Sequence, residues 1–358
     1  MMASFIQLLL VLVLAIQALA LTARDLFDVD FNANFLGGCQ WAGEDKINRM
    51  LAESVTLANR GIEAVNDYGD PIKPEAKRLI DAWFKPQNAD DRLAIRERFT
   101  RVRDWVQNGG PLSHDRNVRP RLFCHHGWAE KLKMESQYRD ANGNYVSNLD
   151  GTPVLIRDVP DMVEARSIMA NDMDLRINYI YPYWNRITRT YWFDKRYSNG
   201  GYNTGWCSGN VGAMTFHVQN VMASITLCPL GLGTTNQRPS NWVYHPLRET
   251  QPIPITSQQV AFNQMPPLSQ IVTDLAPTAA NLFHELFHLV LGSDNSAPPY
   301  PPGEVYQITP MLGLTFNLAI VNPETFVTVA VAYDYTRSID RNPQGERVEF
   351  FTGYTTQG

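Results

Sequence analysis

The sequence of 358 residues predicts an α+β fold. We expect an N-terminal helical layer, a small and mostly antiparallel sheet, and one buried helix packed beneath that sheet. Three observations lead to this expectation: apolar residues recur at helical spacing through the first third, aromatic-rich and strand-prone segments occupy the middle, and residues 277–291 form an apolar stretch without an internal glycine. The apolar content of 44% is ample for a packed core.

The N-terminal layer begins after a polar stretch, residues 21–38, which we interpret as an extended lead-in. Its three acidic residues are most simply a solvated tail: Asp25, Asp28 and Asp30. Apolar residues then recur every three to four positions, the period of a helix with one buried face. This rhythm predicts helices over residues 44–65, 74–84 and 89–106.

The middle of the chain predicts turns and strands. Asp140–Asn144 and Asn148–Gly151 are rich in turn residues and suggest hairpins. We expect a short helix over 163–170 and strand structure within 177–193, followed by two paired strands at 214–221 and 222–227. Proline and polar residues dominate 229–268, which we interpret as a long surface excursion.

The last third predicts two helices. Pro277 stands where a helix can begin and Gly292 where it can end. The helix between them is apolar on nearly all sides and is therefore expected to be buried. Asn322 followed by Pro323 is typical of the start of another helix, which continues through Tyr335.

Residues 1–20 have the pattern of a secretory signal peptide. Phe5–Ile16 is apolar apart from Gln7, and Ala18-Leu19-Ala20 predicts cleavage after Ala20. The run is shorter than the roughly 20 residues that a membrane span needs. We therefore expect a soluble, secreted, monomeric protein with one domain over 21–358. Its net charge of −5, without a basic block, argues against a nucleic-acid partner.

The chain has four cysteines, and an even number in a secreted protein favours two disulfides. Their spacings do not include the CxxC pattern of structural zinc sites. Four cysteines allow three pairings. Cys207 and Cys228 flank the predicted strand pair and are the natural local pair, which leaves Cys39 to pair with Cys124.

The polar residues of the apolar helix form a metal-binding pattern. Residues 284–288 read HELFH, which places His284 and His288 four positions apart and hence on one face of the helix. Two imidazoles so placed can both bind one Zn²⁺. Glu285 lies beside them and could take a proton from a water molecule that zinc has acidified. The pattern predicts a zinc-dependent peptidase. The alternative is a core helix whose histidines bond backbone carbonyls, which leaves Glu285 unexplained.

In the order of these motifs along the sequence, the chain resembles the aspzincin metallopeptidases, which are the deuterolysin and peptidyl-Lys metalloendopeptidase type found in fungal secretions. The resemblance spans roughly residues 36–337, and the stretch around 125–200 has no clear counterpart, which suggests an insertion. Four features support it: Gly38-Cys39 before a long helix, Ala82-Trp83-Phe84 before an arginine-rich helix, Cys207 followed by Cys228, and HELFH followed by the Asn322 helix. The resemblance implies a zincin-like fold and a zinc endopeptidase.

The third zinc ligand is where the sequence departs from the family pattern. The family uses an Asp in a Gly-Thr-x-Asp-x-x-Tyr-Gly loop, of which residues 292–295 keep only a part. We favour Asp294, six residues after His288, and keep Glu304 as the alternative. The family also has an oxyanion-stabilising tyrosine near this ligand. That role falls to Tyr306 here, or less favourably to Tyr300.

Two other functions compete with the peptidase. The chain could be a non-catalytic zinc-binding or surface interaction protein on a peptidase scaffold, because fold does not fix function. It could also be a secreted structural or host-contact protein without a metal. Glu285 argues for catalysis, since a protein that only binds zinc has no need of it.

Overall fold

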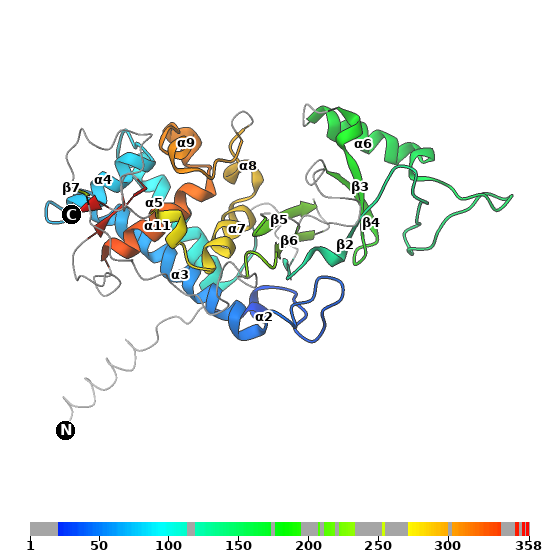
Figure 1. Ribbon diagram of the computed structural model, residues 1–358, viewed down its shortest axis with the longest axis horizontal. Coiled ribbons are helices and arrows are strands. Elements are labelled where there is room, and N and C mark those ends of the chain that lie inside the picture. The colour runs from blue at the N-terminus through cyan, green and yellow to red at the C-terminus, as the bar shows by residue number, and fades with distance from the viewer. Residues whose placement is uncertain are drawn as a thin grey trace, which may run out of the picture.

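The structure is a computed structural model with an α+β architecture. It describes residues 21–112, 119–172, 176–194, 207, 211–218, 222–232, 253–254, 271–299, 303–337, 348–350, 353–354 and 356–357. Figure 1 shows most of the helices gathered at one end of the molecule, strands β5 and β6 in the middle, and a smaller lobe with β2, β3, β4 and α6 at the other end.

The helical body is built from the predicted amphipathic segments. Helix α3 packs against α5, α7 and α11, and α4 lies against α3 and α11. The three N-terminal predictions are confirmed within two residues at each end, because their apolar faces are buried against one another. The short helices α2, α8, α9 and α10 connect this body. The bounds are α2 Ala23–Leu26, α3 Glu44–Asn66, α4 Pro74–Trp83, α5 Ala89–Asn108, α7 Ala279–Leu291, α8 Ser293–Ser296, α9 Ile308–Leu312, α10 Phe316–Ala319 and α11 Pro323–Arg337.

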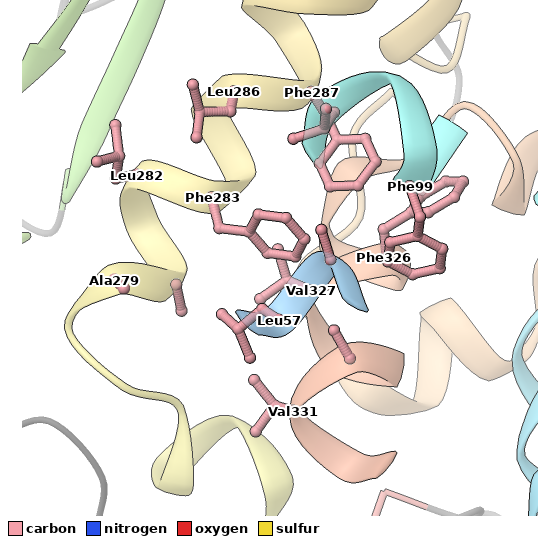
Figure 2. Close-up of a cluster of buried hydrophobic side chains, with 14 of the residues drawn as sticks. Leu57, Phe99, Ala279, Leu282, Phe283, Leu286, Phe287, Phe326, Val327 and Val331 are labelled. Atoms are coloured by element: carbon pink, nitrogen blue, oxygen red, sulfur yellow. The ribbon is translucent and has the colours of Figure 1, made fainter. Parts of the chain in front are cut away.

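A group of phenylalanines forms the centre of the body behind α7. The Phe287 ring lies 4.7 Å from that of Phe326 and 5.9 Å from that of Phe99, between ring centroids. Figure 2 shows Phe283 and Phe287 pointing from α7 toward these residues of α11 and α5. Helix α3 approaches closely at Gly61, where a Cβ atom would lie 2.3 Å from the Phe99 ring. The apolar side of α7 is thus held rigidly, which fixes the direction of its polar side.

The sheet beside α7 has the strand order β1-β6-β5. Strands β5 (Ala213–Val218) and β6 (Met222–Leu227) are antiparallel, as predicted, and β1 (Arg121–Phe123) is parallel to β6. Side chains alternate between the two faces of a strand. Thr215 and Ile225, which are paired in register, face α7, whereas Phe216 packs on Trp128 on the other side.

The smaller lobe contains the antiparallel sheet β2-β3-β4 and helix α6. Both predicted turns are present: Asp140 N donates to Asn144 O, and Asn148 N donates to Thr152 O. The lobe has a small core of its own, formed by Met134, Ile156, Ala170, Ile180 and Phe193. The remaining bounds are α6 Pro160–Asp172, β2 Ala129–Lys131, β3 Tyr181–Asn185, β4 Thr190–Asp194, β7 Ile253–Pro254, β8 Val348–Glu349 and β9 Thr356–Gln357.

The prediction of an extended, solvated lead-in is confirmed only for its acidic residues, since Asp25, Asp28 and Asp30 are exposed. Residues 23–26 form α2, and Leu26 and Phe27 are buried, with Phe27 packed against Trp105. Asp25 accepts hydrogen bonds from the backbone N–H and the hydroxyl of Thr22, which caps this short helix. The pKa of Asp25 is lowered chiefly by the Thr22 hydroxyl. Asp28 pairs with Arg121, and Asp30 accepts from Asn32 N. Asp25 and Asp30 thus have local partners, whereas Asp28 pairs with a residue of β1.

Both predicted disulfides are present. Cys39 bonds Cys124 and Cys207 bonds Cys228. The first ties the start of α3 to the end of β1, and the second joins the chain before β5 to the residue after β6.

Within the described residues there is no helix long and apolar enough to cross a membrane. The predicted signal peptide, and most of the predicted excursion over 229–268, lie outside the described residues. Among the described strands β1-β6 and β7-β9 pair in parallel and the other pairs are antiparallel, so the strands are mostly antiparallel, as predicted, but form three small sheets.

Candidate metal centre

The motif HELFH lies in α7, one of the most buried helices of the described chain. Gly292 follows its last residue with φ of 82°, a conformation that glycine adopts without strain, and ends the helix as predicted. His284 and His288 are on consecutive turns, with ring centroids 5.2 Å apart. His284 is 6% exposed and Glu285 is 7% exposed, and the side chain of His288 is 14% exposed. The two rings are therefore largely shielded from water.

One carboxylate oxygen joins the two imidazoles. Glu304 Oε1 lies 2.7 Å from His284 Nε2 and 3.2 Å from His288 Nε2. These three residues are also the group of described side chains whose ligand atoms all lie close enough, within 4.8 Å, to hold one metal ion. Two imidazole nitrogens and one carboxylate oxygen are the protein ligands of a common type of catalytic zinc site. The donor set therefore fits a divalent metal ion.

The other nitrogen of His284 is fixed by Glu324, the second residue of α11. Nδ1 of His284 lies 3.0 Å from Glu324 Oε2. A carboxylate can only accept, so Nδ1 carries the proton of this hydrogen bond. The lone pair of the neutral ring is then on Nε2, which faces Glu304. A carboxylate behind a histidine in this way orients metal-binding imidazoles in many proteins.

Ser296 has the same effect on His288. Its hydroxyl donates to Gly292 O at 2.8 Å and lies 3.0 Å from His288 Nδ1. Because the Ser296 hydroxyl donates its proton to Gly292 O, its oxygen accepts a hydrogen bond from His288 Nδ1–H. The lone pair of the His288 ring is then on Nε2. Both histidines thus present the nitrogen that a metal ion requires toward the same carboxylate. This convergence is the strongest structural sign that the cluster is a metal centre.

The loop that carries Glu304 is braced by the start of α11. The Asn322 side chain accepts from Val305 N at 2.9 Å and donates to Val305 O at 3.0 Å, and it is completely buried. This amide pair fixes the backbone next to Glu304. Asn322 immediately precedes α11, as predicted for the start of this helix, and its side-chain oxygen accepts from the loop. The first residues of α11 therefore position one candidate ligand and orient another.

The cluster is strongly coupled electrostatically. Burial alone would lower the pKa of His284, but the Glu304 and Glu324 carboxylates outweigh it, and the pKa lies well above its ordinary value. Burial would raise the pKa of Glu304, but the charge and hydrogen bonds of the two histidines hold it far below its ordinary value. When no metal ion is bound, the two carboxylates thus favour the protonated form of His284.

Metal affinity should rise with pH because of this competition. A group whose pKa is raised in the folded protein keeps its proton to higher pH, so a metal ion that binds here would have to displace the His284 proton. We expect the apparent zinc affinity to increase about tenfold per pH unit while one proton is released. Chelator competition at pH 6, 7 and 8 measures this dependence. A pH-independent affinity would show that His284 is not protonated where the metal binds.

Glu285 points from α7 toward the sheet rather than into the ligand group. Its Oε2 accepts from the Thr215 hydroxyl of β5 at 2.7 Å. Tyr306 lies on the other side: its ring stacks on His284 with centroids 5.6 Å apart, and its hydroxyl donates to Glu304 Oε2 at 2.7 Å. Burial of the hydroxyl and the Glu304 charge raise the pKa of Tyr306, so the phenol stays a donor. The residue as a whole is nevertheless 56% exposed.

The structure therefore brings together five residues that the sequence singled out: His284, Glu285, His288, Glu304 and Tyr306. It places Glu304, the alternative ligand, in contact with both histidines. Asp294, which the sequence favoured, is in α8, but its side chain lies outside the described ones, as does Tyr300. The role of Asp294 stays a prediction.

Sequence reasoning missed Glu324, Ser296 and Thr215 as partners of the motif. The Asn-Pro-Glu start of α11 was a signal for the first of these, whereas isolated Ser and Thr residues carry none.

Comparison of the chain with protein-family models, with curated proteins and with solved structures finds no match. The chemistry of the cluster alone therefore bears on function.

Proposed function

We propose that this protein is a secreted zinc-dependent endopeptidase, with a zincin-like fold that is similar to that of the aspzincins. The observation that carries the proposal is the convergence of His284 Nε2 and His288 Nε2 on one Glu304 oxygen, with the Nδ1 atoms engaged elsewhere. Glu285 follows His284 on α7 and lies outside the group of candidate ligands. That combination is what metal-assisted hydrolysis requires.

In this proposal His284, His288 and Glu304 hold the metal ion. When bound, zinc supplies a Lewis acid that acidifies a water molecule and polarises the substrate carbonyl. Glu285 accepts the water proton and later delivers it to the leaving amine. Glu324 and Ser296 keep both imidazoles in the tautomer that leaves Nε2 available. The Tyr306 hydroxyl, which donates to Glu304 Oε2, would turn to the substrate oxygen and stabilise its negative charge.

The test is the zinc content of the purified protein, measured beside casein cleavage in the same samples. We expect about one zinc per chain in the wild type, loss of zinc in His288→Ala, and cleavage that a chelator abolishes. The exposed residue Glu164 of α6 provides a control, since Glu164→Ala should change neither quantity. Zinc without cleavage would favour a non-catalytic zinc-binding protein instead. Absence of zinc would contradict both functions and leave α7 as a core helix.

A further inference from the structure

Thr215 of β5 forms a hydrogen bond with the Glu285 carboxylate, which the proposed function treats as the general base. Its Oγ1 lies 2.7 Å from Glu285 Oε2 and 3.1 Å from the Glu285 backbone oxygen. Both residues are buried. A threonine hydroxyl has one proton, and the shorter contact with a charged acceptor is the stronger hydrogen bond. The hydroxyl therefore donates chiefly to Oε2.

The strand cannot easily present another residue at this point. His217, two positions along β5 and hence on the same face, bonds the His288 backbone oxygen at 3.1 Å. Phe216 packs edge-on against the stacked rings of Trp128 and Trp192 on the opposite face. Strand β5 is thus attached to α7 at residues 285 and 288, and a shift of one residue would reverse both faces. The position of the Thr215 hydroxyl is fixed by this register.

The hydrogen bond has a consequence for the geometry of Glu285. A glutamate side chain is flexible, and one fixed oxygen restricts the rotation of its carboxylate. Threonine is suited to this, because its branched Cβ limits the rotation of χ1. With Oε2 engaged by Thr215, Oε1 is the oxygen that can accept a proton from water. Reactions of this kind lose rate when the base is displaced by as little as about 1 Å.

We propose that Thr215 is a positioning residue that holds the Glu285 carboxylate in the orientation needed for proton transfer. This inference rests on the proposed function. It assigns Thr215 no contact with the metal ion or the substrate. The alternative is a purely structural role, in which the hydroxyl only satisfies the backbone oxygen of residue 285.

The test compares Thr215→Val, which has nearly the same shape without the hydroxyl, with Thr215→Ser, which keeps the hydroxyl. We expect the valine variant to keep its zinc and its KM within about twofold and to lose kcat by roughly 10- to 100-fold, a part of what a general base contributes. The serine variant should recover most of kcat. Thr336→Val is the matched control, since it removes a buried hydroxyl that bonds a backbone oxygen at the far end of α11.

A second measurement does not depend on catalysis. Thermal unfolding of the metal-free chain is compared for Thr215→Val, for Glu285→Met and for the double variant. If the two side chains share a hydrogen bond, the second substitution should lower Tm less than it does alone. Additive Tm shifts, an unchanged kcat in Thr215→Val, or failure of serine to rescue would overturn the role of Thr215. Absence of cleavage by the wild type would instead overturn the proposed function, and the positioning role with it.

Discussion

Replacing Glu285 by Gln is expected to lower the rate of peptide cleavage by at least about 10²-fold while zinc stays bound. This is the size of rate loss that removal of a general base usually causes. The amide keeps the size of the side chain and can still accept from Thr215, so the helix and its contact with β5 should persist. It cannot take a proton from water. Because Glu285 is not in the group that joins His284, His288 and Glu304, the metal should not depend on it.

The measurement is kcat/KM on a peptide substrate, with zinc per chain and Tm determined on the same preparation. Glu164→Gln on the exposed side of α6 is the matched control, because it makes the same chemical change away from the cluster. Cleavage at the wild-type rate would show that Glu285 is not the base. Loss of zinc together with activity would instead assign Glu285 a part in binding the metal.

Regular periodicity made the helical body predictable. Helices α3, α4 and α5 follow from apolar spacing that repeats over several turns, and α7 follows from its composition between Pro277 and Gly292. The lead-in was misjudged because a helix of four residues has no period to detect. Leu26 and Phe27 are buried by contacts with distant segments, such as the Trp105 ring, and the local sequence does not encode those contacts.

The site was predictable to the extent that one helix defines it. The spacing of His284 and His288 fixes their common face without any knowledge of the fold. Glu304 comes from a loop 16 residues after His288, and loops have no spacing that predicts where a side chain points. Its position depends on Asn322, which braces the neighbouring Val305. The partners Glu324 and Thr215 likewise reach α7 only through tertiary packing.

The second variant with a large expected effect removes Glu304, the proposed third zinc ligand. We expect Glu304→Ala to weaken zinc binding by more than about 10²-fold, beyond the roughly 10- to 100-fold that loss of an outer-shell partner costs. Glu304 contributes the one carboxylate oxygen that contacts both imidazoles, and its charge balances the cation. Its loss leaves two neutral nitrogens, which hold a divalent ion far less tightly than a set of three ligands.

Two companion variants make this result specific. Glu324→Ala removes the partner of His284 Nδ1 and should weaken zinc binding by an intermediate amount, within the outer-shell range. Asp294→Ala should leave zinc binding unchanged if Glu304 is the ligand. Affinities from chelator competition at one pH place the three variants on a common scale.

If Asp294→Ala loses the metal and Glu304→Ala keeps it, the ligand is the one that the family resemblance favoured, and Glu304 is only the hydrogen-bond acceptor of the metal-free site. If both lose it, the two carboxylates share the ion, and the coordination exceeds the three protein ligands of the usual catalytic site.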